Sequence, residues 1–598
     1  MYRKTFSKAR SALIGFSFLT FGTVLFSSTS AMASEYQVGD EIQLQILATS
    51  DMHGRFLPYD YVLNQEDYSG SCAQVATAVD DLRTEDTIVI DAGDIIQSNS
   101  SELFWQDDLH PMMLAMNEIG YDVWVAGNHD FDCGMDTLCQ IIPQNNATLL
   151  CGNVYDEDMN PLADDYTIIE RSGVKIAIIG MVSPIIQSVN SSQLGGWTVT
   201  DPVEETRKVI DEIEDQVDIL IAVDHMDIDE ELGMENSGAE DLAYACPELD
   251  LIIAAHGHKE VENVFINGVP IIENAISGET LAQILMDLEY TDDGWEMDRI
   301  GTKLLYMEEY DADETLSDQL QPYHERAVED AETVIGYMDS EYLAAPDEIP
   351  GVPTARVEDS ALIDFINEAI LYYSGADVTS SALTFSDANI YEGEIRKCDI
   401  SHIYRYSNTI YNMEMTGAQL KKWMEWCACF YNTYEEGDLT ISFNPDFASY
   451  NYDSFSGVNY EINIANEPGS RIENLTWPDG SPVEDDDVFI AAVTSYRYAY
   501  LSSYGTVFEE GDELPKLIQA DVRSDIGDVR NWLVSYISNE LDGVVTASCD
   551  YNWQVTGNDW DEDLHQEAVD RINDGSITWQ LTNGWTPNTT SVTVEDLL

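Results

Sequence analysis

Five short polar clusters in the first half of the chain hold the residue types that bind metal ions. Neutral imidazole, carboxylate and amide oxygen are the ligands that divalent transition metals accept in proteins. Two such metals held side by side can activate water and stabilise a phosphoryl displacement. Each cluster directly follows an apolar run, and the clusters are Asp51-Met52-His53-Gly54-Arg55, Asp91-Ala92-Gly93-Asp94, Gly127-Asn128-His129-Asp130-Phe131-Asp132, Asp224-His225 and His256-Gly257-His258.

The placement of histidine makes these clusters informative. The chain has 112 Asp and Glu, so an acidic match at any one position has little weight. It has only nine histidines, and five lie in the clusters, whereas His110, His324, His402 and His565 do not. We therefore expect the ordered set of five clusters, rather than any single motif, to mark a site.

The apolar runs before the clusters are short and rich in β-branched residues, as is typical of strands. They alternate with longer mixed segments from residue 41 to about residue 290, which favours an α/β sandwich or a doubly wound sheet. Because ligands gather outside the carboxyl ends of the strands in such sheets, we expect the clusters to converge. The predicted strands are 42–48, 87–90, 123–126, 174–179, 219–223 and 251–254.

Residues 309–333 separate this region from a second one. They predict a polar, acidic helix with few apolar positions, so we expect a solvated connector rather than part of a core. A helical pattern over 361–373 then leads into mixed α and β segments up to the last residue. The predicted organisation is a signal peptide over 1–33, a first domain over 34–308, a linker helix over 309–333 and a second domain over 334–598.

The first 33 residues have the pattern of a secretory signal peptide. Four basic residues precede an apolar run over 13–26, and Ala31-Met32-Ala33 supplies a cleavage site. We expect cleavage near Ala33, a mature chain that begins at Ser34, and secretion to the extracellular space or the periplasm. An uncleaved anchor is the alternative. We expect no membrane span in the mature chain.

The charge balance is strongly acidic. With 26 Lys and Arg against 112 Asp and Glu, the formal net charge is −86, which excludes non-specific binding to nucleic-acid duplexes and anionic membranes. Salt screens the self-repulsion that this charge creates, so the composition favours a halophilic protein. Nine cysteines are too few for a disulfide scaffold, and their odd number leaves at least one thiol unpaired within a monomer.

The order and form of the five clusters resemble the calcineurin-like metallophosphoesterases. The stretch over 127–132 is similar to the exported 5'-nucleotidase branch of that family. The resemblance implies an α/β fold, with an N-terminal four-layer metallophosphoesterase α/β sandwich, a C-terminal nucleotide-binding α/β domain of the 5'-nucleotidase type, and a helix that joins them.

The resemblance also implies roles for the cluster residues. One divalent metal takes Asp51, His53, Asp94 and His258, and a second takes Asp94, Asn128, His225 and His256, so Asp94 bridges the two. His129 and Asp132 match the catalytic pair of the family. The implied cofactors are two divalent metal ions, with zinc, manganese, cobalt and iron all open.

Segments of the second half resemble the C-terminal domain of the same family. Residues 374–378 and 415–420 carry that resemblance, and residues 404–411 and 452–462 favour the 2',3'-cyclic-nucleotide 2'-phosphodiesterase/3'-nucleotidase branch. Where the 5'-nucleotidase branch has Asn-Gly-Gly-Ile-Arg, residues 386–390 are Ser-Asp-Ala-Asn-Ile and lack the arginine. By position, the base lies between Phe455 and Tyr496, and either Tyr498 or Tyr500 is an alternative to Tyr496.

Together these features predict a secreted dinuclear-metal hydrolase that attacks nucleotide substrates with metal-activated hydroxide. The resemblance favours 2',3'-cyclic-nucleotide 2'-phosphodiesterase and 3'-nucleotidase activity. Two alternatives stay open. One is a 5'-nucleotidase or nucleotide-sugar hydrolase, and the other is a non-catalytic surface or binding protein of the same fold.

Overall fold

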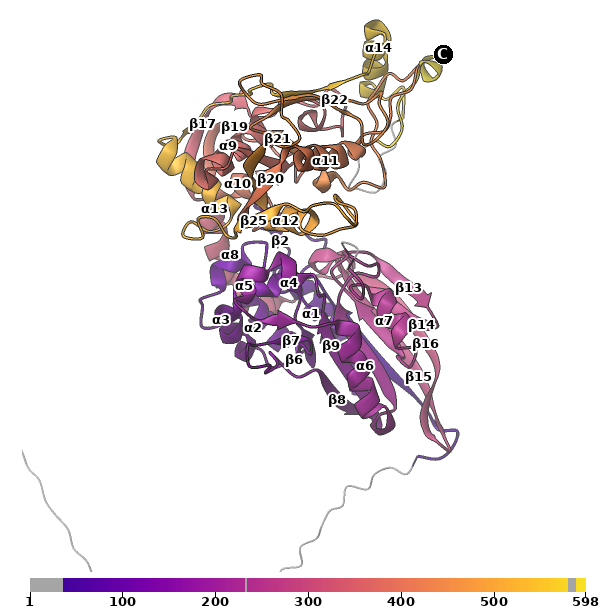
Figure 1. Cartoon of the computed structure of the whole chain (residues 1–598). Coiled ribbons are helices and arrows are strands. Elements are labelled where there is room, and N and C mark those ends of the chain that lie inside the picture. Colours follow the sequence, from indigo (N-terminus) through magenta and orange to yellow (C-terminus); the bar gives the residue numbers. More distant parts are fainter. Residues whose placement is uncertain (1–35, 232–233, 579–587) are drawn as a thin grey trace, which may run out of the picture.

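The computed structural model describes residues 36–231, 234–578 and 588–598. The predicted signal peptide over 1–33 lies outside these residues. Two α/β domains lie end to end, the first coloured indigo to magenta and the second orange to yellow (Figure 1).

The first domain contains two six-stranded sheets that pack face to face. One has the order β16-β15-β1-β4-β5-β6 and the other β13-β14-β12-β11-β9-β8. In the first sheet the strands are β1 (Glu41–Thr49), β4 (Thr87–Asp91), β5 (Val123–Val125), β6 (Thr148–Leu150), β15 (Thr280–Thr291) and β16 (Gly294–Tyr306). In the second they are β8 (Tyr166–Arg171), β9 (Val174–Val182), β11 (Ile219–His225), β12 (Leu251–Ala254), β13 (Val261–Ile266) and β14 (Val269–Glu273).

Side chains along the strands alternate between the core that lies between the two sheets and an outer core between each sheet and its helices. Ile46 and Ile221 face the core between the sheets, whereas Leu47 and Leu220 pack outward against helices. Burial on both faces explains why these strands are nearly continuous apolar runs. The outer helices are α1 (Cys72–Leu82), α2 (Pro111–Ile119) and α3 (Met135–Ile141) on one side, with α6 (Pro202–Ile213) and α7 (Ala239–Ala245) on the other. The predicted four-layer sandwich is confirmed.

The second domain is built around a five-stranded mixed sheet with the order β21-β18-β24-β20-β25. Its strands are β18 (Val378–Ala382), β20 (Ile410–Thr416), β21 (Asp453–Ser456), β24 (Val488–Thr494) and β25 (Lys516–Gln519). Two three-stranded sheets flank it, formed by β17 (Val334–Tyr342), β19 (Tyr391–Arg396) and β26 (Val544–Val545), and by β22 (Asn459–Asn463), β23 (Ile472–Thr476) and β27 (Trp553–Thr556). The helices are α9 (Ala361–Ser374), α10 (Lys397–Ile403), α11 (Gly417–Cys427), α12 (Ser495–Leu501), α13 (Val529–Ser535) and α14 (Glu562–Asn573).

Helix α8 (Glu314–Ala331) lies where the sequence predicts a linker helix. It is more than a solvated connector, since Leu316, Leu320 and Ala327 are buried in the outer core of the first domain, next to α1 and α2. These few apolar positions are hard to recognise in the sequence, because acidic residues surround them. The boundaries drawn at 34–308, 309–333 and 334–598 remain predictions.

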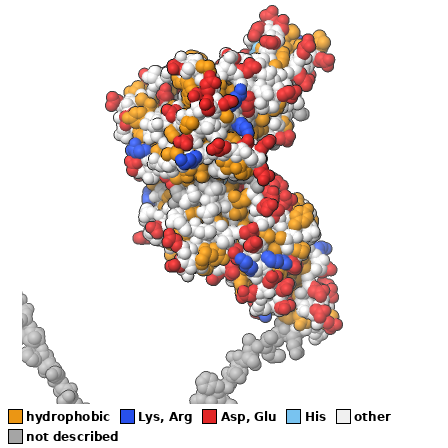
Figure 2. Space-filling view, viewed as in Figure 1, with side chains coloured by type: hydrophobic (Ala, Val, Ile, Leu, Met, Phe, Trp, Pro, Cys, Tyr) orange, Lys and Arg blue, Asp and Glu red, His pale blue; other side chains and the backbone are white. Residues whose placement is uncertain are grey.

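The two domains contact each other directly. Helix α12 and strand β25 of the second domain face the first domain, and α12 packs against α4 (Ile186–Val189) (Figure 1). A partly buried ion pair joins Arg530 to Glu102 at 3.0 Å. Acidic side chains are spread over both domains (Figure 2). Within the described ranges, we find no helix that is both long and apolar enough to cross a membrane.

Candidate metal centre

The five polar clusters lie at the carboxyl ends of β1, β4, β5, β11 and β12. The chain turns sharply there, and five residues adopt positive φ angles that L-amino acids other than glycine rarely take. They are Asp51 (51°), His53 (44°), Asp94 (60°), His256 (76°) and His258 (55°). Such backbone strain concentrates at functional sites.

Glycine is required where two of these turns touch. A Cβ atom on Gly93 would lie 2.5 Å from the backbone nitrogen of Gly127, and one on Gly127 would lie 2.2 Å from Asp94 Oδ1. The contact brings the β4 and β5 loops together and sets Asp94 beside Asn128 and His129.

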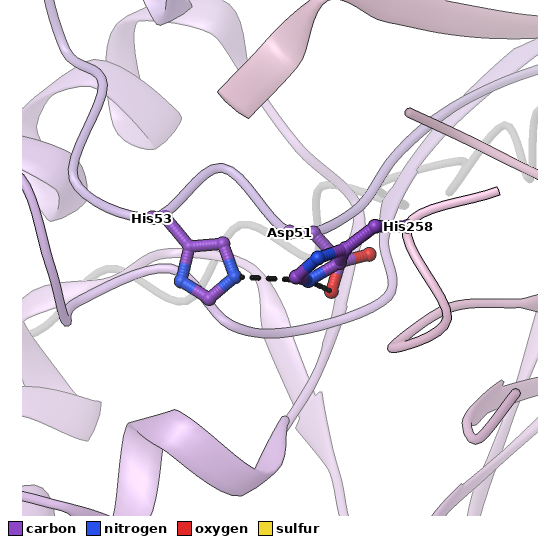
Figure 3. Close-up of side chains that lie close together, drawn as sticks. All are labelled: Asp51, His53 and His258. Atoms are coloured by element: carbon purple, nitrogen blue, oxygen red, sulfur yellow. Dashed lines mark hydrogen bonds and ion pairs between the residues drawn. The ribbon is translucent and has the colours of Figure 1, made fainter. Parts of the chain in front are cut away.

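Asp51, His53 and His258 form the first group of candidate ligands (Figure 3). The Nε2 atoms of His53 and His258 are 3.3 Å apart, and His258 Nε2 is 3.4 Å from Asp51 Oδ1. Asp51 is fully buried, and His53 is 7% exposed.

Asp94, His225 and His256 form the second group, with Asn128 beside it. His225 Nε2 lies 3.2 Å from Asp94 Oδ2 and 3.0 Å from Asn128 Oδ1. Asp94 Oδ2 is also 3.8 Å from His53 Nε2, so this carboxylate lies between the two groups. The structure thus brings all seven predicted ligands together.

The donor set fits bound cations. His225 Nδ1 lies 2.7 Å from the carbonyl oxygen of Ala92, which can only accept a hydrogen bond, so Nε2 presents a lone pair toward Asp94 and Asn128. Among the described residues, Asp94 Oδ2 is buried without a hydrogen-bond partner. With the His225 ring neutral, these lone pairs converge on one point, where a bound metal ion would satisfy them.

The pKa shifts agree with this fit for three of the ligands. Burial lowers the pKa of His53 to about 3, so its ring is neutral. Burial acts to raise the pKa of Asp94, but the surrounding His225, His129 and His53 hold it well below its usual range. Asp51 behaves similarly, because His258 outweighs the effect of burial and lowers its pKa. Neutral imidazole and ionised carboxylate are the forms that bind metals. Burial acts to lower the pKa of His225 and His256, but Asp94 raises the first and Glu231 raises the second to about 10, so these two rings release a proton when a metal binds.

His129 and Asp132 form a hydrogen-bonded pair at the edge of the centre. His129 Nδ1 lies 2.8 Å from Asp132 Oδ2, and Asn190 Nδ2 donates to Asp132 Oδ1 at 2.7 Å. Burial acts against a charged ring, but Asp132 and Asp94 raise the pKa of His129 to about 9. The side chain of His129 is 33% exposed, so the ring is accessible to a substrate.

Three further residues support the centre without having been assigned a role from the sequence. The carboxylate of Asp130 accepts backbone N–H groups of four residues: Gly127, Asp94, Ile95 and Ile96. Glu231 Oε2 lies 3.0 Å from His256 Nε2, and Gln97 Oε1 lies 3.3 Å from His53 Nδ1. Asp130 lies within the third polar cluster, but no feature of the sequence around Glu231 distinguishes it from the other acidic residues.

The structure does not bring Phe455 and Tyr496 together as a pair of stacking faces. Phe455 is 2% exposed on β21, where its ring packs edge-on against Trp423 with ring centroids 4.7 Å apart. A ring that is covered on all sides leaves no face for a base. The alternation of the strand points Phe455 into the core of the second domain.

Tyr496 belongs instead to a group of aromatic side chains at the domain interface. Its hydroxyl is 2.8 Å from that of Tyr500, and its ring centroid is 6.4 Å from that of Tyr450. Burial, followed by Tyr500, Tyr406 and Glu231, raises the pKa of Tyr450 to about 12. Helix α12, which carries Tyr496 and Tyr500, packs against α4, and Asn190 at the end of α4 donates to Asp132 at the edge of the metal centre, so this group lies on the same side of the first domain as that centre. Tyr498, the other alternative, packs against Tyr411.

Comparison with known proteins defines the class of this chain. Residues 44–260 match the family described as calcineurin-like phosphoesterase, and residues 334–509 match the family described as 5'-nucleotidase, C-terminal domain. The chain belongs to the calcineurin-like phosphoesterases that carry a 5'-nucleotidase C-terminal domain. It is therefore a phosphoric ester hydrolase of a family that uses divalent metals.

Several relatives are similar over much of the chain. The trifunctional nucleotide phosphoesterase protein YfkN of Bacillus subtilis is 26% identical over 608 residues, which span 89% of this chain but only 40% of that protein. The 2',3'-cyclic-nucleotide 2'-phosphodiesterase/3'-nucleotidase of Haemophilus influenzae is 25% identical over 600 residues, with 87% of this chain and 89% of the relative covered. A 5'-nucleotidase of Vibrio cholerae is 32% identical over 250 residues, which are 40% of this chain and 44% of that protein.

A solved structure supports the two-domain fold. A Staphylococcus aureus protein in complex with alpha-ketoglutarate superposes with a TM-score of 0.73 at 20% identity, covering 86% of this chain and 100% of that chain. At this identity the similarity establishes the fold alone.

Proposed function

We propose that this chain is an exported, dinuclear-metal hydrolase of nucleotides, acting as a 2',3'-cyclic-nucleotide 2'-phosphodiesterase and 3'-nucleotidase. The observation that carries the proposal is the buried, unpartnered Asp94 Oδ2 between two groups of metal-binding side chains. The H. influenzae relative with that name aligns over nearly the whole chain, which supports the choice of substrate.

Seven side chains hold the metals in this proposal. Asp51, His53 and His258 bind one ion, and Asn128, His225 and His256 bind the other, with Asp94 shared. When bound, two divalent ions lower the pKa of water and neutralise charge on phosphate oxygens. His129, oriented by Asp132, donates a proton to the leaving ribose oxygen or stabilises its developing charge.

The base binds among the interface tyrosines rather than at Phe455. Tyr496, Tyr450 and Tyr500 are half-buried, so part of each ring is accessible for stacking. Base stacking is worth ~1–3 kcal/mol per base and tolerates any base. Because this group lies on the same side of the first domain as the metal centre, one nucleotide reaches both domains.

The absence of the 5'-nucleotidase arginine has a structural counterpart. Asn389 stands in that segment, and its Oδ1 accepts the backbone N–H groups of Leu343 and Ala344 at 3.0 and 2.9 Å. Its neighbours Ala388 and Ile390 are buried. Residues 386–390 therefore stabilise the local backbone and contain no cationic side chain that could bind a 5'-phosphate. The V. cholerae relative favours the alternative of a 5'-nucleotidase or nucleotide-sugar hydrolase.

A substrate panel on the purified protein in high salt tests the proposal. We expect kcat/KM for 2',3'-cyclic AMP and 3'-AMP to exceed that for 5'-AMP by at least about tenfold, or ~1.4 kcal/mol of transition-state discrimination. A preference for 5'-AMP or UDP-glucose rejects the cyclic-nucleotide assignment. Absence of turnover on every ester, with both metals bound, favours a non-catalytic binding protein.

A pair of tyrosine variants tests the base site. Tyr496→Ala should raise KM for nucleotides and leave hydrolysis of bis-p-nitrophenyl phosphate near wild type, since that ester has no base. Tyr504→Ala is the matched control, because Tyr504 is exposed just beyond α12. Equal effects of the two variants on KM contradict the proposed site.

A further inference from the structure

One side chain of the metal centre is held by a residue of the other domain. Gln97 follows the second polar cluster and is 3% exposed. Its amide Nε2 donates a hydrogen bond to Ser407 Oγ at 2.8 Å, across a separation of 310 residues. Its other amide atom, Oε1, lies 3.3 Å from His53 Nδ1. Gln97 thus connects Ser407 of the second domain to a candidate metal ligand of the first.

The direction of these hydrogen bonds determines the form of His53. In the orientation that the amide has here, Nε2 donates to Ser407 and Oε1 faces the imidazole, and an amide oxygen can only accept. His53 Nδ1 must then carry the proton. The lone pair of the ring is left on Nε2, which faces His258 at 3.3 Å and Asp94 at 3.8 Å.

Ser407 lies in a loop of the second domain, so it contacts Gln97 only when the second domain is docked on the first. The loop connects α10 to β20, within the stretch 404–411 that the sequence singles out. Elsewhere in the interface, Arg530 pairs with Glu102, and Ser191 Oγ lies 3.4 Å from the hydroxyl of Tyr411. Neither of these contacts reaches a candidate metal ligand directly, so the connection through Gln97 is distinct from them.

We propose that Gln97 is a positioning residue through which the docked second domain orients His53 and tightens metal binding at the first group of ligands. The inference rests on the proposed function only in taking His53, Asp51 and His258 as metal ligands. Partners that orient a ligating histidine typically change metal affinity by ~10–100-fold. By linkage, metal bound at the first group also stabilises the docked arrangement of the domains.

Metal binding by the full chain, without substrate, tests the inference. We would titrate the metal-free protein with Zn²⁺ against a competing chelator and determine the affinities of both sites. Gln97→Leu should lower the Zn²⁺ affinity of one of the two sites by about 10–100-fold. The Zn²⁺ affinity of the other site should stay near that of the wild type. Gln97→Glu should restore affinity, because a carboxylate still accepts from His53 Nδ1 and from the Ser407 hydroxyl.

Ser407→Ala tests the role of the second domain and is a mild change if Gln97→Leu does not fold. We expect a loss of affinity of about 2–12-fold, the range for one hydrogen bond. Ser538→Ala, on an exposed serine of the same domain, is the matched control and should bind metal as the wild type does.

Two results overturn the inference. One is wild-type affinity at both sites in Ser407→Ala or in a folded Gln97→Leu, and the other is a Gln97→Glu variant as impaired as Gln97→Leu. The proposed nucleotide activity is judged separately by the substrate panel. A titration that overturns the role of Gln97 therefore does not contradict the proposed nucleotide activity. An unexpected substrate in the panel does not contradict the role of Gln97.

Discussion

The buried ion pair between Arg497 and Asp453 provides a quantitative test of how α12 is held in place. Arg497 Nε lies 2.8 Å from Asp453 Oδ2, and the two side chains are 4% and 5% exposed. The guanidinium also lies 5.0 Å from the ring centroid of Trp426 and 5.1 Å from that of Tyr500. The pair therefore joins α12, which carries Tyr496, to strand β21.

Replacing Arg497 by Met should destabilise the second domain strongly. The Asp453 carboxylate would stay buried with Trp423 Nε1, at 3.2 Å, as a remaining side-chain donor. Removing one partner of a buried ion pair costs ~3–5 kcal/mol, and we expect the free energy of unfolding to fall by that amount. In the double variant Arg497→Met/Asp453→Asn the uncompensated charge is gone, so part of the stability should return.

Urea unfolding monitored by tryptophan fluorescence measures these differences. The matched control is Arg523→Met, because the Arg523–Asp525 pair lies in the same domain with side chains 43% and 68% exposed. Exposed pairs contribute little, so this variant should unfold at nearly the wild-type urea concentration. The reasoning is refuted if Arg497→Met is no less stable than Arg523→Met, or if the double variant is no more stable than Arg497→Met alone.

Three other predictions follow from the metal centre, the charge and the leader. Asp94→Ala should abolish turnover and lower the metal content measured by mass spectrometry. His129→Asn should lower kcat but keep a metal content near that of the wild type. Loss of metal from His129→Asn would contradict this division of roles. Thermal stability should be higher in molar NaCl than in 50 mM buffer, since salt screens the net charge of −86, and a flat or falling melting temperature would argue against a halophilic protein. Mass analysis of the exported protein should find Ser34 at its N-terminus, and retention of residues 1–33 would indicate an anchored form.

The fold and the convergence of the ligand loops could be predicted from the sequence because the signals are local. Each strand is an apolar run followed at once by a polar cluster, and parallel strands bring such ends together. Asp51, Asp94 and His225 illustrate this, since each follows or ends its strand and all three meet at the centre. The scarcity of histidine separated these positions from the many surface acids.

The contacts that the sequence did not predict depend on tertiary packing. Glu231 is one of 112 acidic residues and acquires meaning only through its 3.0 Å contact with His256. Gln97 has no charge, and its link to Ser407 spans 310 residues. Phe455 is an aromatic residue of the kind that stacks on bases, but all four residues of β21 are buried, and Trp423 and Tyr460 pack against its ring.

Several energetically unfavourable features of this structure lie where the chemistry is expected. Five candidate ligands have positive φ, and Asp51 and Asp94 are buried close to several imidazoles. A sequence selected for stability alone would avoid such strain and such burial of charge. Bound cations would offset the cost of burying Asp94 Oδ2. The backbone N–H groups that donate hydrogen bonds to Asp130 hold the strained loops in place. The second domain reaches the same loops through Gln97. If the two proposals above hold, its docking would both help to hold the ligands in their binding geometry and supply a surface for the base.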